Sequence, residues 1–122
     1  MLRLDAPNDN RNNLDWHQDS PYYMQTYPDL NGAVCWLPLT CNSENNGTLI
    51  YIPSTHGNVI KPKTLFADSD KLSTQHSINP SSKQFSNMKN MNGELGDMTA
   101  LHLNTGINLK TYLKIILYLY LI

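Results

Sequence analysis

The stretch that decides the fold class is GAVCWLPLTCNSENNGTLIYIP, residues 32–53. It contains two short apolar runs separated by a polar loop, and the pair Asn46-Gly47 stands directly before the second run. Asn and Gly both tolerate positive φ, so this pair indicates a tight turn that leads into a strand. We therefore predict strands over residues 32–39 and 48–53, and we expect the first of them to be well buried.

The same pattern continues on both sides of this stretch. Short apolar runs separated by Asn, Gly, Pro and Ser indicate a β protein. Further strands are expected over residues 2–4, 14–17 and 98–103, with a short one near 64–66. Residues 57–91 are polar and lack periodicity, which is typical of a long functional loop or of disorder. The length of 122 residues indicates a single domain.

Composition excludes several classes of protein. The formal net charge is −1 and the basic residues are scattered, so we expect no nucleic-acid partner. The first residues have no apolar segment of a signal peptide, which predicts a cytoplasmic protein. Cys35 and Cys41 have no cysteine pair beside them, so we expect buried or half-buried thiols and no structural zinc. The apolar residues 109–122 are interrupted by two lysines and fall short of the ~20 residues of a membrane span.

The segment DWHQDSPYY, residues 15–23, carries the candidate chemistry. Residues two apart on a strand point the same way, so His17 and Asp19 can converge on one point while Gln18 faces away. One imidazole and one carboxylate are two of the three ligands that hold non-haem Fe(II) and leave positions open for oxygen chemistry. The alternative is a histidine and an aspartate that merely form a surface hydrogen bond.

Three segments in this order resemble the phytanoyl-CoA dioxygenase family: WHQDSPYY, GAVCWLPLTCNSENNGTLIYIPSTHG and GELGDMTALH. The resemblance covers roughly residues 2–104. It implies an all-β fold, the double-stranded β-helix or jelly roll, which is cupin-like. It also implies an Fe(II)- and 2-oxoglutarate-dependent dioxygenase that hydroxylates a small organic substrate while 2-oxoglutarate is decarboxylated to succinate. Neither a membrane nor a nucleic acid is expected as a partner, and the oligomeric state is open.

The resemblance implies roles for particular residues. His17 and Asp19 match the first two iron ligands of the family. Trp36 falls at a strand tryptophan that lies near the 2-oxoglutarate pocket in relatives, and its alternative is a plain core aromatic. His56, within PSTHG, matches a histidine that is structural or near the mouth of the cavity rather than a metal ligand. His76 lies in the polar loop and is expected to be solvated.

The third iron ligand is where the sequence departs from the family. The second histidine of the family comes some five residues beyond the position that His102 occupies, and Ile107 stands there. Residues 105–108, TGIN, look like the end of the expected motif with the histidine lost. The arginine that binds the far carboxylate of 2-oxoglutarate also lacks a counterpart, because the arginines of the chain are Arg3 and Arg11.

These departures divide the chain into a jelly-roll oxygenase-like domain, residues 1–104 with the long polar loop 57–91, and an atypical apolar tail, residues 105–122. The jelly roll is therefore expected to be incomplete at its C-terminal end. The tail could be a final buried strand, a core helix or the product of a shifted reading frame. We favour the last of these, because the departure from the family begins where the tail begins.

Two outcomes for function follow. His102 could serve as the third ligand after local rearrangement, which would give an iron-dependent dioxygenase. Otherwise the chain is an inactive fragment, which is the outcome we favour. The alternative outside enzymology is a non-catalytic cupin-like binding module or a degenerate family member.

Overall fold

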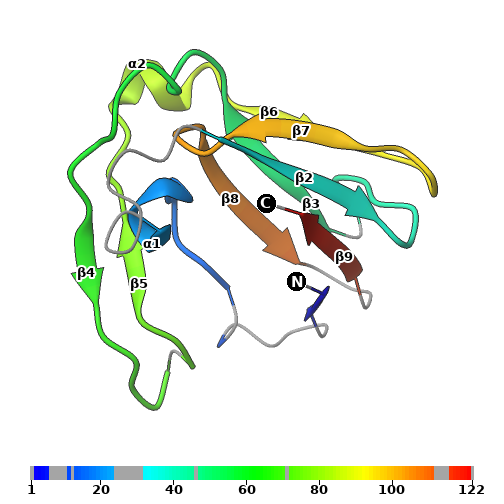
Figure 1. Cartoon of the computed structure of the whole chain (residues 1–122), viewed down its shortest axis with the longest axis horizontal. Coiled ribbons are helices and arrows are strands. Elements are labelled where there is room, and N and C mark those ends of the chain that lie inside the picture. Colours follow the sequence, from blue (N-terminus) through cyan, green and yellow to red (C-terminus); the bar gives the residue numbers. More distant parts are fainter. Residues whose placement is uncertain are drawn as a thin grey trace.

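The computed structural model describes residues 2–5, 11, 13–23, 32–45, 47–70, 72–111 and 116–121, with only the backbone for 2–5, 110–111 and 116–121. Strands and two short helices make up the described fold, with antiparallel pairing throughout (Figure 1). The elements are β1 (Leu2–Asp5), α1 (Ser20–Tyr23), β2 (Ala33–Pro38), β3 (Gly47–Ile52), β4 (Lys63–Leu65), β5 (Gln75–Ser77), α2 (Ser82–Phe85), β6 (Lys89–Met91), β7 (Thr99–His102), β8 (Gly106–Thr111) and β9 (Ile116–Leu121).

The strands form two main sheets and one small one. The first sheet has the order β1-β9-β2-β7, the second has the order β6-β3-β8, and β4 pairs with β5. The strand over residues 14–17 is reduced to isolated bridges, in which His17 pairs with Ile107 of β8 and with Ser77 of β5. The segment that contains His17 therefore lies along the open edge of the second sheet and connects it to the small one.

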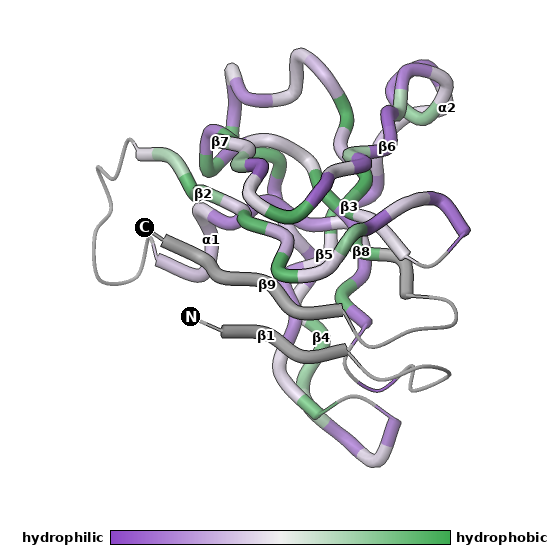
Figure 2. The backbone as a smooth tube through the Cα atoms, turned by 90° about the vertical axis from the view of Figure 1, so that its right-hand side faces the viewer, coloured by the Kyte–Doolittle hydropathy of each residue, from purple (hydrophilic) through white to green (hydrophobic). Residues whose placement is uncertain are grey.

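The hydrophobic core lies between the two main sheets. Along β2 the side chains alternate, with Val34, Trp36 and Pro38 buried, because successive residues of a strand point to opposite faces. Burial of a large apolar side chain stabilises the fold by about 1.5–3 kcal/mol. In Figure 2 hydrophobic stretches gather around β2, β3 and β7, a further one lies at β4, and α2 stands at the periphery. The core cluster consists of Val34, Trp36, Leu49, Met91, Leu101, Leu103, Ile107 and Leu109.

The turn before β3 has the conformation that its sequence demands. Gly47 has φ +113°, a region that favours glycine, and its N–H donates to the Ser43 carbonyl at 2.9 Å. The prediction of a turn at this position is confirmed. The predicted strands over 2–4, 32–39, 48–53 and 98–103 correspond to β1, β2, β3 and β7, and the all-β jelly-roll class is confirmed.

The polar region 57–91 contains more regular structure than its sequence predicts. It contains β4, β5, α2 and β6, and only β4 was expected. A capping box begins α2, in which the Ser81 side chain accepts from the Gln84 backbone and the Gln84 side chain accepts from the Ser81 N–H. These elements have few apolar residues, so their pattern carries no periodicity. β4 and β5 pair with each other, β6 pairs with the distant β3, and α2 begins at its own capping box.

The range expected to be an atypical tail also contains two strands. β8 pairs with β3 from Gly47↔Thr111 to Ile52↔Gly106, and β9 pairs with both β1 and β2. Residues 105–122 thus contribute one strand to each main sheet, and a final strand is one of the alternatives considered for this range. Neither helix in the described residues is long and apolar enough to cross a membrane.

Candidate metal site

His17 and Asp19 point toward one another from the edge of the second sheet. The His17 Nε2 atom lies 3.6 Å from Asp19 Oδ1, and the two side chains are 6% and 16% exposed. The convergence expected from their spacing is confirmed. Their shared direction places an imidazole nitrogen and a carboxylate oxygen around one buried point.

The His17 side chain faces the interior of the jelly roll. His17 N–H donates to the Ile107 carbonyl at 3.0 Å, and Ile107 N–H donates to the His17 carbonyl at 2.8 Å. Two residues joined in this way across antiparallel strands have their side chains on the same face. Ile107 belongs to the core cluster, and Tyr51 is the next residue across the sheet. The site is therefore lined by apolar and aromatic groups.

One hydrogen bond sets the tautomer of His17. The Nδ1 atom lies 2.7 Å from the Asp15 carbonyl oxygen, and a carbonyl oxygen can only accept, so Nδ1 carries the proton. In the neutral ring the lone pair is then on Nε2, the atom that faces Asp19. Metal-binding histidines are commonly oriented by such a bond from the second ring nitrogen.

The electrostatics of the site favour a cation. Burial raises the pKa of the Asp19 carboxyl above its usual value, and the charge of His17 offsets part of this rise. Burial and the charge of Asp19 together raise the pKa of the Tyr23 hydroxyl. A positive ion between the imidazole and the carboxylate would offset the desolvation of Asp19.

Gln18 points away from His17 and Asp19, as expected. Its side chain is fully buried, its Nε2 donates to the Asn58 carbonyl at 3.0 Å and to the Asn104 carbonyl, and its Oε1 accepts from the Ile60 N–H at 2.8 Å. The amide thus ties the loop after β3 to the turn between β7 and β8. All three hydrogen bonds are with backbone groups, so the residue between the two candidate ligands has a structural role.

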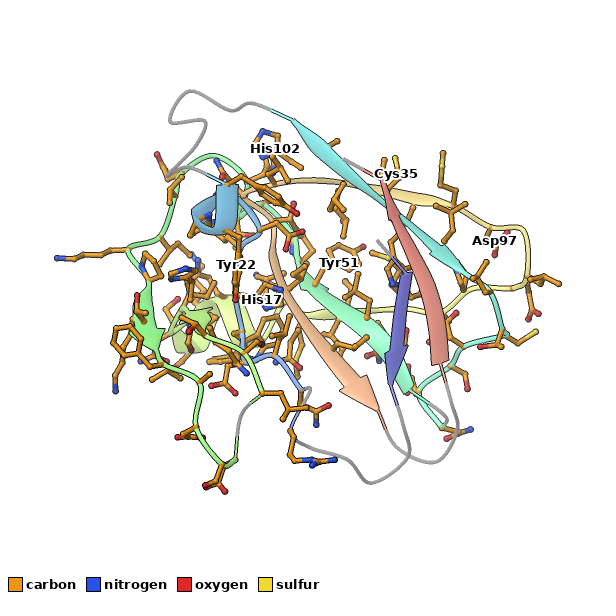
Figure 3. All side chains as sticks on the ribbon, turned by 60° about the horizontal axis from the view of Figure 1, so that its bottom comes forward. His17, Tyr22, Cys35, Tyr51, Asp97 and His102 are labelled. Atoms are coloured by element: carbon orange, nitrogen blue, oxygen red, sulfur yellow. The ribbon has the colours of Figure 1, made fainter. Side chains whose placement is uncertain are left out.

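The structure does not bring His102 to this pair. His102 ends β7, opposite Ala33 at the start of β2, and Figure 3 shows it well away from His17. Its Nδ1 accepts from the Asn104 N–H at 3.0 Å, and its ring centroid lies 6.0 Å from that of His56. Within the part of the chain that the structure describes, no three His, Cys, Asp or Glu side chains are close enough to hold a metal ion together. The reason is topological, because β7 belongs to the first sheet and His17 lines the second.

The other expected residues lie as follows. Trp36 is 1% exposed in the core cluster, the position of a core aromatic, and its role beside 2-oxoglutarate stays a prediction. His56 is exposed. His76 is half-buried instead of solvated, because its ring contacts that of Tyr22 at 4.8 Å. Cys35 is half-buried, whereas Cys41 is exposed, contrary to expectation, since it lies in the loop after β2.

Sequence reasoning missed the residues that surround His17. Tyr22 lies with its ring 6.0 Å from that of His17, edge to face, and Figure 3 shows the two side by side. The Gln75 side chain holds the backbone that precedes His17, because it accepts from the Asp15 N–H and donates to the Asn13 carbonyl. The repeated tyrosines of DWHQDSPYY were a visible signal for the first of these. Gln75 had no signal, because it lies in a polar segment far along the chain.

Two antiparallel sheets around one core, with a His-x-Asp segment facing that core, define the jelly-roll class of double-stranded β-helices. Residues 5–105 match the phytanoyl-CoA dioxygenase (PhyH) family, and the chain belongs to this family. Among curated proteins, no sequence matches the chain.

Solved structures give the same fold. EvdO2 from Micromonospora carbonacea var. aurantiaca superposes with a TM-score of 0.71 at 19% identity, over 98% of this chain and 48% of that protein. EctD from S. alaskensis has a TM-score of 0.64 at 15% identity, over 98% of this chain and 41% of EctD. Both proteins have also been solved with 2-oxoglutarate. The chain thus spans about half the length of the solved structures that it matches.

Proposed function

We propose that this chain is part of a non-haem Fe(II)- and 2-oxoglutarate-dependent dioxygenase that hydroxylates a small organic substrate, with His17 and Asp19 as two of the iron ligands. The observation that carries the proposal is the buried His17–Asp19 pair, with Nε2 and Oδ1 3.6 Å apart on the inner face of the jelly roll. Membership of the phytanoyl-CoA dioxygenase family supports it.

The donor set fits a divalent transition metal. Imidazole and carboxylate donors suit iron, and metal–ligand bonds of about 2.0–2.2 Å at angles of 90–120° would separate two donors by roughly 2.8–3.8 Å. The tautomer of His17 suits a metal ligand, because the Nδ1–H group bonds to the Asp15 carbonyl and Nε2 is then the atom that would bind the metal in the neutral ring. Trp36 is proposed to line the 2-oxoglutarate pocket.

The residues of this chain would hold the metal and exclude water. When bound, Fe(II) would supply the oxidative chemistry in which 2-oxoglutarate is decarboxylated and a substrate C–H bond is hydroxylated. His17 and Asp19 would fix its position from one edge of the site, leaving the remaining positions open. Ile107 pairs with His17, and Tyr51 is the next residue across the sheet, so their side chains would restrict bulk water from that side.

A second candidate is a degenerate family member that does not catalyse the reaction. The observation that favours it is the lack of a third His, Cys, Asp or Glu near His17 and Asp19 within the described ranges. The sequence adds that Ile107 stands where the family's second histidine is expected. In this case the jelly roll would bind a ligand without turning it over.

An anaerobic Fe(II) titration followed by succinate release from 2-oxoglutarate tests both candidates. We expect His17→Ala and Asp19→Ala each to abolish iron binding, while His56→Ala, an exposed histidine elsewhere, serves as the matched control and keeps it. Iron binding without succinate would favour the degenerate member. The ligand assignment is wrong if both site variants bind iron as well as the parent. His102→Ala tests the rearranged site, which requires this variant to weaken iron binding.

A further inference from the structure

The four consecutive residues 75–78 hold the segment that carries His17. Gln75 binds the backbone at two points, and the His76 N–H donates to the Tyr22 hydroxyl at 3.0 Å. Ser77 forms a bridge with His17, and the Ile78 N–H donates to the Trp16 carbonyl at 2.7 Å. Part of the polar region that was expected to be a loop therefore holds the segment of the proposed metal site.

Gln75 has the most buried polar side chain among residues 75–78. Its side chain is 1% exposed, its Oε1 accepts from the Asp15 N–H at 3.1 Å, and its Nε2 donates to the Asn13 carbonyl at 3.0 Å. A buried amide is tolerated only when its polar atoms are hydrogen-bonded, and both polar atoms of Gln75 are bonded to one short stretch of backbone. The side chain thus stabilises the backbone conformation of residues 13–15.

The contact continues directly to the His17 imidazole. Gln75 holds the N–H of Asp15, and the carbonyl of the same residue accepts from His17 Nδ1 at 2.7 Å. One residue links its own N–H and C=O through only two soft torsions, so holding the N–H limits where the carbonyl can point. A carbonyl held in that direction favours the proton on Nδ1 of His17, while Asp19 Oδ1 lies 3.6 Å from the other ring nitrogen, Nε2.

We propose that Gln75 is a positioning residue that selects the Nδ1–H tautomer of His17 through the backbone of Asp15, and that it thereby presents Nε2 to the metal. The role at the metal rests on the proposed function. The selection of the tautomer does not, because every contact in the relay is between groups of the metal-free protein.

The tautomer is measured first, in the metal-free protein. Long-range ¹H–¹⁵N spectra at pH 8 distinguish Nδ1–H from Nε2–H rings, and His17→Ala identifies the His17 signals. We expect the Nδ1–H form in the parent and a mixture or the Nε2–H form in Gln75→Leu, which cannot accept from Asp15. Gln75→Glu retains an acceptor oxygen and should keep the parent tautomer. If Gln75→Leu does not fold, a shifted tautomer in Gln75→Glu overturns the proposal, because the acceptor for the Asp15 N–H is retained in that variant.

Asn42→Leu provides the matched control. Asn42 is also a buried amide that holds backbone, with its Nδ2 donating to the Met91 carbonyl at 3.0 Å, but it belongs to the loop between β2 and β3. Asn42→Leu should be less stable than the parent and should leave the His17 spectrum unchanged. An unchanged tautomer in folded Gln75→Leu overturns the proposal, as does an equal change in Asn42→Leu.

Co(II) affinity is measured second, by titration calorimetry of the same variants. Loss of the bond that orients a ligating histidine typically weakens metal binding by about 10–100-fold, so we expect that loss in Gln75→Leu and near-parent affinity in Asn42→Leu. A parent that binds no Co(II) contradicts the proposed metal site and leaves the tautomer result to decide the role of Gln75. Unchanged affinity in a variant whose tautomer has shifted overturns the link to the metal.

Discussion

Replacing Ile107 by histidine is expected to add a third protein ligand beside His17. The two backbones are joined by reciprocal hydrogen bonds of 3.0 and 2.8 Å. Such a pair has Cα atoms about 5.5 Å apart with both side chains on one face. The imidazole of a histidine at this position would therefore lie next to the His17 side chain and face the same interior, toward which the Asp19 carboxylate also points.

The size of the effect follows from the burial of Ile107. Its side chain is 3% exposed in the core cluster, and a polar ring there is expected to lower the free energy of unfolding of the metal-free protein by about 2–4 kcal/mol. A metal ion that binds only the folded state, at a concentration of 100 times its Kd, raises the free energy of unfolding by about 2.7 kcal/mol. A third ligand should tighten binding at least tenfold, which corresponds to about 1.4 kcal/mol.

The assay combines Co(II) titration with thermal unfolding, each with and without metal. The matched control is Leu109→His, which puts the same ring on the same strand and face but two residues from the His17 pair, opposite Leu49. Both variants should unfold at lower temperature without metal, and only Ile107→His should recover with Co(II). The reasoning is refuted if folded Ile107→His binds no tighter than the parent, or if Leu109→His gains as much.

Three further predictions concern stability, each measured by chemical or thermal unfolding. The raised pKa of Asp19 means that the folded state binds the carboxyl proton more tightly than the unfolded state does, so the stability of the metal-free protein should fall as pH rises through that pKa. Asp19→Asn should remove most of this fall. An unchanged pH profile in Asp19→Asn would contradict the prediction. Gln18→Leu leaves buried carbonyls without their donor and should cost about 2–4 kcal/mol, with a loss below 1 kcal/mol counting against the role. Gly47→Ala introduces a Cβ at φ +113° and should cost about 1–3 kcal/mol, unlike Gly57→Ala, where nothing lies within 4 Å of the added atom.

Several features could be predicted from residues close together in the chain. The alternation in β2 and the turn at Gly47 follow from strand periodicity and from the freedom of glycine, which are local properties. The convergence of His17 and Asp19 follows from their spacing of two. Family resemblance supplied the jelly-roll class, which no single local pattern contained.

Tertiary structure decided the features that depend on pairing between distant segments. Gln75 contacts Asp15 across 60 positions, and no periodicity in a polar region indicates such a contact. β9 pairs with β1 and β2, although its unbroken apolar sequence fits several elements equally well. His102 ends β7 of the first sheet, whereas His17 forms a bridge with Ile107 of the second, so only the folded topology separates the two histidines. Which side chains share a sheet depends on long-range register, and local sequence does not encode that register by itself.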